Sequence, residues 1–138
     1  MNILWIQPNG ILALTSIFDD SEPAAHASLL QERGDIPADW ILAATNVEWE
    51  ETGWRHESHR WNGTQIFVDL DAAKVETKSR LREQRAPLLI AQDIKFMEAL
   101  EKGNDIAAIS AEKQRLRDIT KLTDAAEITL GDLKLLSY

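Results

Sequence analysis

The spacing of apolar residues changes near position 70, and the first part predicts a small sheet. Residues 2–7 and 11–17 are two apolar runs of strand length, and residues 8–10 (PNG) between them are a turn sequence. This arrangement predicts a β-hairpin. Residues 40–47 form a further apolar run and predict a third strand. The Asn-Gly pair at 62–63 lies between two strand-like runs and predicts a second hairpin.

One short helix is expected between the first hairpin and the third strand. Residues 24–33 predict this helix, with Asp20 or Ser21 as its N-terminal cap and Pro23 near its first turn. Gly34 is expected to end it, because glycine readily adopts the left-handed conformation that follows a helix.

From residue 71 onward the sequence predicts helices. Asp69 and Asp71 suit a helix start, since a short acidic side chain can accept hydrogen bonds from free backbone N–H groups. Residues 72–84 are mostly strong helix formers, with Val75 and Leu81 as the large apolar residues among them. A helix with so narrow an apolar stripe usually packs against a partner or projects from its domain. We therefore expect Val75 and Leu81 to contact another protein.

Pro87 lies inside this helical stretch and predicts a kink, because proline removes one helical hydrogen bond. Beyond it the apolar residues spread over a wide stripe, which indicates a packing face. The stripe contains Leu89, Ile90, Ile94, Phe96, Met97 and Leu100. Gly103 is expected to end the helix, and Asn104 or Asp105 to start an antiparallel partner helix.

These elements predict an α+β protein with two parts. Residues 1–70 contain 11 acidic and 3 basic side chains and all five tryptophans, whereas residues 71–138 contain 12 acidic and 12 basic side chains. We expect residues 1–70 to be an acidic, Trp-rich, β-rich domain, a small antiparallel sheet with one short helix. Residues 71–138 are expected to be a long kinked helix, an antiparallel helical hairpin and a C-terminal tail with one or two short helices.

Composition removes several classes of function. The net charge of −8, concentrated in the first half, opposes binding to a phosphate backbone, which needs clustered Lys and Arg. The sequence contains no cysteine, so thiol chemistry and disulfides are not expected. We find no signal-peptide pattern and no apolar run long enough for a membrane span. The expected protein is soluble and intracellular when made, without nucleic-acid or membrane partners.

No pattern of catalytic or cofactor-binding residues is present. His56 and His59 flank Glu57, but H-E-S-H differs from the helical HExxH spacing of zinc sites, so we expect a structural or surface role. The glycines form no phosphate-binding loop, and no nucleophile with a matching base is visible. We therefore predict no enzyme, no catalytic residue, no metal site and no cofactor.

Tryptophans in the acidic half give the alternative function. Trp49, Trp54 and Trp61 lie in a loop and hairpin region, where aromatic rings could form a carbohydrate- or peptide-binding surface. Covering one side of a small sheet is the simpler role for these rings. We keep Trp49 and Trp54, together with Val75 and Leu81, as the candidate partner-interface residues.

Short motifs in the helical half match a pattern found in phage proteins. They are Arg82-x-x-Arg85-Ala86-Pro87-Leu88-Leu89 with Asp93, then Phe96-Met97-x-Ala99, then Lys113-Gln114-x-Leu116-Arg117-Asp118-Ile119. The upstream sequence at 60–64 (RWNGT) is similar to the RW-[DN]-G turn of the same group. Over residues 59–122 the chain resembles small tail-module proteins of tailed phages and prophages, some of which look like tail fibre assembly chaperones.

This resemblance implies a non-enzymatic, tail-associated protein. It would act in tail fibre assembly or as a small virion component, with phage tail or tail fibre proteins as partners and a homo-oligomer as an alternative. The implied location is the host cytoplasm during assembly, with the virion tail as the other option. The chain departs from the chaperone pattern, because Ile94 rather than tryptophan follows Asp93 and residues 111–113 (AEK) replace a W-x-x-Y-R sequence.

Overall fold

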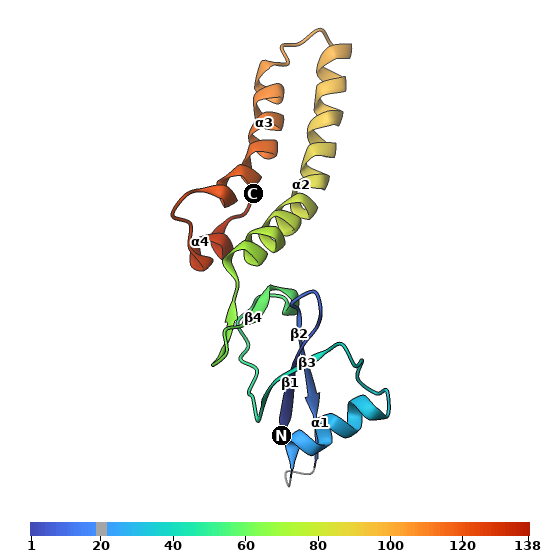
Figure 1. Cartoon of the computed structure of the whole chain (residues 1–138). Helices are drawn as coiled ribbons and strands as arrows, with labels where there is room; N and C mark the ends of the chain where they lie inside the picture. The colour runs from blue at the N-terminus through green and yellow to red at the C-terminus, as the bar shows by residue number, and fades with distance from the viewer. Residues whose placement is uncertain (19–21) are drawn as a thin grey trace. The chain divides into compact units, whose positions relative to one another are not determined.

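The computed structural model describes residues 1–18 and 22–138, so the helix cap predicted at Asp20 or Ser21 lies outside the described residues. The fold is α+β: a small antiparallel sheet precedes a long helix and further helices, as the sequence predicts (Figure 1). Two compact units are present, Met1–Ala72 and Ala73–Tyr138.

The sheet of the first unit has the strand order β2-β1-β3. Strand β1 (Asn2–Ile6) pairs antiparallel with β2 (Leu12–Ser16) on one side and with β3 (Ile41–Thr45) on the other. The predicted β1–β2 hairpin is confirmed. Its turn is closed by a 2.9 Å hydrogen bond from the Gln7 N–H to the Ile11 carbonyl, and Gly10 supplies the positive φ of 80°.

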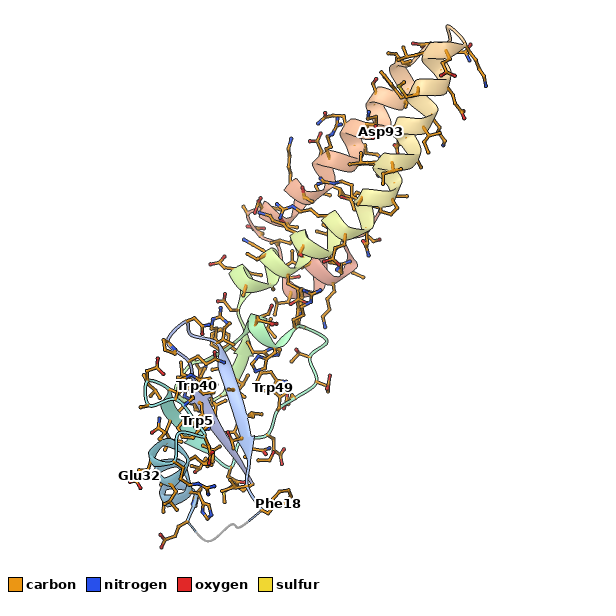
Figure 2. The ribbon with its side chains drawn as sticks, turned by 90° about the vertical axis from the view of Figure 1, so that its right-hand side faces the viewer. Trp5, Phe18, Glu32, Trp40, Trp49 and Asp93 are labelled. Atoms are coloured by element: carbon orange, nitrogen blue, oxygen red, sulfur yellow. The ribbon has the colours of Figure 1, made fainter. Side chains whose placement is uncertain are left out.

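Helix α1 (Pro23–Glu32) covers the core on one side of this sheet. The core contains Ile3, Trp5 and Ala27, all nearly inaccessible, and Trp40 packs against it. Figure 2 shows Trp5 and Trp40 close together beside the strands. The Trp5 indole Nε1 donates a 3.1 Å hydrogen bond to Thr15 Oγ1, so this buried ring has a polar partner.

The second predicted hairpin is also confirmed. Strands β4 (His59–Trp61) and β5 (Ile66–Val68) pair antiparallel after a short 3₁₀ helix, η1 (His56–Ser58). Asn62 Oδ1 accepts hydrogen bonds of 2.9 Å from the N–H groups of Thr64 and Gln65, which stabilises the tight turn.

Helix α2 (Leu70–Glu101) is continuous and contains Pro87 in its interior. Asp69 Oδ2 accepts a 2.9 Å hydrogen bond from the Ala72 N–H, so Asp69 is the cap expected from the sequence. Figure 1 shows the axis of α2 changing direction partway along its length, in agreement with the predicted kink. Proline lacks the N–H that would otherwise bond to the Glu83 carbonyl.

Helix α3 (Ala107–Asp118) returns antiparallel to the second half of α2. Gly103 has a φ of 67°, and the Asn104 N–H donates a 2.8 Å hydrogen bond to the Ala99 carbonyl, which closes α2 as expected. Asp105 Oδ1 then accepts a 3.0 Å bond from the Ala107 N–H at the start of α3.

The C-terminal tail folds back onto the first half of α2. It contains the 3₁₀ helix η2 (Ile119–Asp124) and helix α4 (Leu130–Leu135), whose N-cap is Thr129. Arg80 on α2 donates 2.9 Å hydrogen bonds to the carbonyls of Leu133 and Leu136. Lys78 on α2 pairs with Asp124 at 2.7 Å. Figure 1 shows α4 and the C-terminus beside this half of α2.

This tail corrects one of the sequence-based expectations. Leu81 was expected to contact another protein, but it is fully buried within its own unit. Ala73, Thr77 and Leu133 of the same unit are also fully buried. The expectation for Leu81 was wrong because the tail, some 50 residues later in the chain, covers the side of α2 on which Leu81 lies. Val75, by contrast, is 69% exposed.

Candidate functional site

The second half of α2 has an exposed row of large apolar side chains. Ile90, Ile94 and Met97, which we call the α2 stripe, are 61%, 57% and 57% exposed. Their spacing of four and then three residues places them on one face of the helix. Exposed apolar side chains are common singly, but a contiguous row is typical of an interaction surface.

Helix α3 leaves this row uncovered because it packs on another face of α2. Ala99 of α2 and Leu116 of α3 are buried, and the Lys113 Nζ lies 5.0 Å from the centroid of the Phe96 ring. Phe96 lies two residues from Ile94, and a step of two residues turns a helix by about 200°. The sequence predicted one wide packing face that included both residues. The structure corrects this, because one partner helix covers a single side of α2.

The stripe forms part of a shallow groove with a volume of about 340 Å³. Its lining consists of Ile90, Asp93, Ile94, Met97, Glu98 and Glu101. Three of these six side chains are apolar and three are acidic. Asp93 also forms an ion pair with Lys113 at 2.6 Å, and Figure 2 shows it between the two helices. The groove is therefore an apolar strip with carboxylates beside it.

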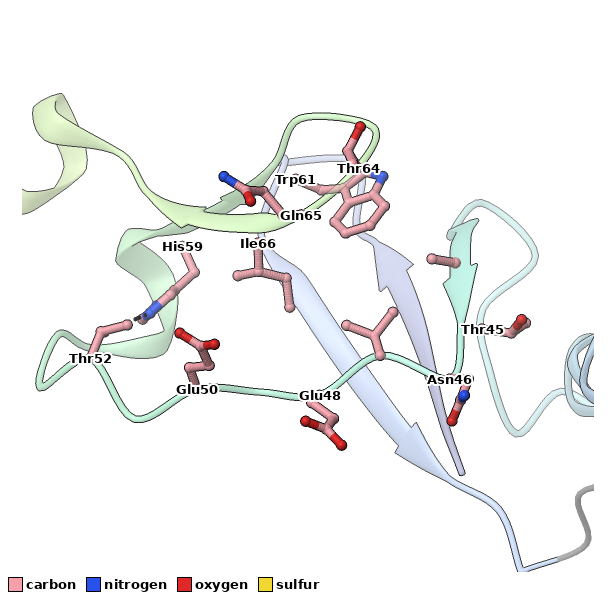
Figure 3. A pocket seen from close by; sticks show the side chains of 12 residues that line it. Thr45, Asn46, Glu48, Glu50, Thr52, His59, Trp61, Thr64, Gln65 and Ile66 are labelled. Carbon is pink, nitrogen blue, oxygen red and sulfur yellow. Dashed lines mark hydrogen bonds between the residues drawn. The ribbon is translucent and has the colours of Figure 1, made fainter.

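A larger pocket of about 580 Å³ lies in the first unit (Figure 3). It is bordered by the end of β3, the segment that follows it, and the β4–β5 hairpin. The lining residues are Ala44, Thr45, Asn46, Val47, Glu48, Glu50, Thr52, His59, Trp61, Thr64, Gln65 and Ile66. The pocket thus combines one indole ring with carboxylate, amide and hydroxyl groups, which can bind a polar ligand.

His59 is buried at the edge of this pocket, with both ring nitrogens hydrogen-bonded. Its Nδ1 lies 2.9 Å from the Arg55 carbonyl oxygen, and its Nε2 lies 2.8 Å from Thr52 Oγ1. A carbonyl oxygen can only accept, so Nδ1 donates to it, and Nε2 shares a hydrogen bond with the Thr52 hydroxyl. Trp49 stacks on the His56 ring at a centroid distance of 4.9 Å and contacts the His59 ring at 4.6 Å.

His56 and His59 thus make packing contacts with the Trp49 ring, and the His59 ring also holds two hydrogen bonds within the first unit. In the described parts of the chain, residues 1–18 and 22–138, no group of three or more His, Asp or Glu side chains is placed to hold a metal ion. None of the helices in this described portion is both long enough and apolar enough to cross a membrane.

The structure separates the four candidate interface residues. Leu81 is buried, Val75 is exposed on α2, and Trp49 and Trp54 are half-buried in the first unit. Trp61, rather than Trp49 or Trp54, lines the pocket. Sequence reasoning also missed the α2 stripe as a surface. Its three residues were visible as an apolar row, but nothing in the sequence indicated which side of α2 the partner helix would cover.

No protein-family model, curated protein or solved structure matches this chain.

Proposed function

We propose that this chain is a non-enzymatic phage or prophage tail-associated protein that binds another protein through the α2 stripe. It would act in tail fibre assembly, in the host cytoplasm, or remain as a small component of the virion tail. The observation that carries the binding role is the exposure of Ile90, Ile94 and Met97 in one row.

Burying such a row on a partner is energetically favourable. Each large aliphatic side chain contributes about 1.5–3 kcal/mol when it passes from full exposure to full burial. The three side chains of the stripe are a little over half exposed, so roughly half of that gain is still available at each one. A partner that covered all three would gain several kcal/mol from apolar contact, before the cost of association.

The tail assignment is supported by the motifs that resemble phage tail-module proteins. Their segments lie on facing helices: Asp93 belongs to the first segment, on α2, and Lys113 opens the second, on α3. The two residues form an ion pair at 2.6 Å. The two helices that carry the motifs are thus joined by a direct contact, made by a lysine of the AEK sequence in which this chain departs from the chaperone pattern.

Co-purification with the product of a neighbouring tail fibre gene tests this function. We expect the two proteins to co-elute on size exclusion, and Ile94→Glu to reduce the complex about tenfold or more, because a charge would be buried in the contact. Leu135→Glu is the matched control, since Leu135 is an apolar residue of α4 that is 82% exposed and lies outside the groove. Both variants should keep the far-UV circular dichroism of the wild type.

Two results would contradict the proposal: no complex with the fibre protein, or salt-sensitive binding to DNA in its place. Mass spectrometry of purified virions then separates an assembly factor from a structural component. The chain should be present at a fixed ratio to the tail proteins in the second case, and missing in the first.

The pocket of the first unit supports a second candidate, carbohydrate or peptide binding. Trp61 offers a flat apolar ring, and the Asn46, Glu48 and Gln65 side chains line the same cavity. Ligand sites combine apolar surface with a few polar groups in this way. Trp61→Ala should then abolish binding to an oligosaccharide array that the wild type recognises, whereas Ile94→Glu should leave that binding intact.

A further inference from the structure

We propose that the α2 stripe binds a basic amphipathic helix of its partner. This inference rests on the proposed function, in which the stripe contacts a protein, and adds the chemistry of the segment that is bound. Two observations carry it: the helical spacing of the apolar row, and the acidic side chains that line the same groove.

The spacing favours a helix as the occupant. Ile90, Ile94 and Met97 cover two turns of α2, or about 10 Å along its axis. A row of side chains at this spacing forms a ridge, and a second helix packs against it when its own apolar residues recur every three or four positions. Helix-in-groove recognition uses the same anchor spacing. An extended strand would present side chains every second residue and would match this row less well.

The charges favour a basic occupant. Asp93, Glu98 and Glu101 line the groove, and among its six described lining residues none is lysine or arginine. Asp93 is already paired with Lys113, so Glu98 and Glu101 are the carboxylates that face an incoming partner. Lysine or arginine beside the apolar anchors of the partner would meet these carboxylates. Complementary charge at an interface rim raises the association rate and selects between partners.

The same charges disfavour a second copy of this chain as the occupant. A symmetric contact through the stripe would bring the Glu98 and Glu101 carboxylates of both copies to one interface. The chain also has a net charge of −8, so the long-range interaction between two copies is repulsive. A partner with basic residues would avoid both the repulsion between carboxylates at the interface and the long-range repulsion between two acidic chains.

Two synthetic peptides test the inference on the full-length protein. Each is about 16 residues long, roughly four helical turns, with leucine at four positions of one face in the i, i+3, i+4, i+7 pattern. One carries lysine on both flanks of the leucine row, and the other carries glutamate at the same positions. With a fluorescent label on the peptide, we expect anisotropy to show at least about tenfold tighter binding of the lysine peptide at low salt. The difference should shrink at 0.5 M salt, which screens exposed charges.

Variants of the protein separate the apolar and charged contributions. Ile94→Ala should weaken binding of the lysine peptide several-fold, and Glu98→Gln with Glu101→Gln should bring the two peptides to nearly equal affinity. These residues are exposed, so the fold should be unaffected, which circular dichroism checks. The controls are Leu135→Ala, at an exposed apolar residue of α4, for the apolar change and Glu127→Gln for the loss of an exposed acid outside the groove. Neither should change the affinity.

The outcomes distinguish this inference from the function on which it rests. If the fibre protein co-elutes and Ile94→Glu disrupts the complex, but the double glutamine variant binds it unchanged, the stripe is an interface and its partner is not basic. Equal binding of both peptides by the wild type would overturn the inference as well. A concentration-dependent dimer that Ile94→Glu dissolves, detected by sedimentation, would identify a second copy as the occupant and also overturn it. If the wild-type protein did not co-elute with the fibre protein, the proposed function itself would be contradicted.

Discussion

Asp93 on α2 and Lys113 on α3 form an ion pair, with Oδ1 and Nζ 2.6 Å apart. The same Nζ lies 5.0 Å from the centroid of the Phe96 ring, so the lysine contacts both a carboxylate and an aromatic face. The Lys113 side chain is 18% exposed, whereas that of Asp93 is 58% exposed. The contact therefore joins the two helices mainly through the covered lysine.

We predict that Lys113→Ala destabilises the protein more than Asp93→Asn. A half-exposed ion pair contributes about 0–1 kcal/mol, so Asp93→Asn should cost less than about 1 kcal/mol. Lys113→Ala also removes the covered aliphatic stem and its contact with the Phe96 ring. Urea denaturation of both variants gives the comparison. An equal loss in the two variants would mean that the ion pair alone accounts for the contact.

Leu81→Ala should destabilise the second unit by about 2–5 kcal/mol, because Leu81 is fully buried and its truncation leaves a cavity. Val75→Ala is the matched control on the same helix, and should change the unfolding free energy by less than about 0.5 kcal/mol. Thermal melting followed at 222 nm measures both. If Leu81→Ala melted like the wild type but lost a binding partner, Leu81 would belong to an interface, as the sequence suggested.

Thr77→Val should stabilise the protein by about 1 kcal/mol. Within the described residues, Thr77 is completely buried and its Oγ1 has no hydrogen-bond partner. A buried unpaired hydroxyl costs about 1–3 kcal/mol, and valine has the same shape without it. Chemical denaturation measures the change, with Thr77→Ala as the control that opens a cavity and should destabilise. A less stable Thr77→Val variant would indicate that the hydroxyl is hydrogen-bonded in solution.

The cap of α4 gives a pH-dependent prediction. Hydrogen bonds from the Thr129 side chain and then from its backbone N–H lower the pKa of the Asp132 carboxyl below its ordinary value. Because the folded-state pKa lies below the unfolded one, this carboxylate stabilises the fold at pH values above the unfolded pKa. The contribution is lost as the pH falls through the folded pKa.

The stability advantage of the wild type over Asp132→Asn should therefore shrink between pH 7 and about pH 3. Denaturation midpoints of both proteins at the two pH values measure it. The difference between the two proteins cancels the titration of all other groups. A constant advantage at both pH values would contradict a role for the Asp132 charge.

Much of the fold follows from local sequence signals. The turn at residues 8–10, the Asn-Gly pair at 62–63, Asp69 before α2 and Gly103 after it each act within a few residues. The structure places them in the elements that they predict. Pro87 likewise sets the kink, since a missing N–H has the same effect wherever the helix packs. These features depend on backbone conformation and short-range hydrogen bonds, which the sequence encodes directly.

The sequence also named the three residues of the α2 stripe, as members of an apolar row on α2. What it could not determine is which side of α2 is covered. Apolar residues lie on more than one face of that helix, and their local spacing does not indicate which face is buried. The choice depends on residues far away in the chain. Lys113 of α3 contacts Phe96 of α2, and the C-terminal tail is held by Arg80 and Lys78 on the half of α2 that contains the buried Leu81.

The tertiary structure therefore decided that Leu81 is a core residue and that Ile90, Ile94 and Met97 form an open surface. Lys78 and Asp124 are 46 positions apart, and Arg80 and Leu136 are 56 positions apart. Burial is a property of contacts at such separations, because a side chain loses water only when another part of the chain reaches it. The sequence by itself determines which positions are apolar. Long-range packing determines which of these side chains remain exposed to a partner.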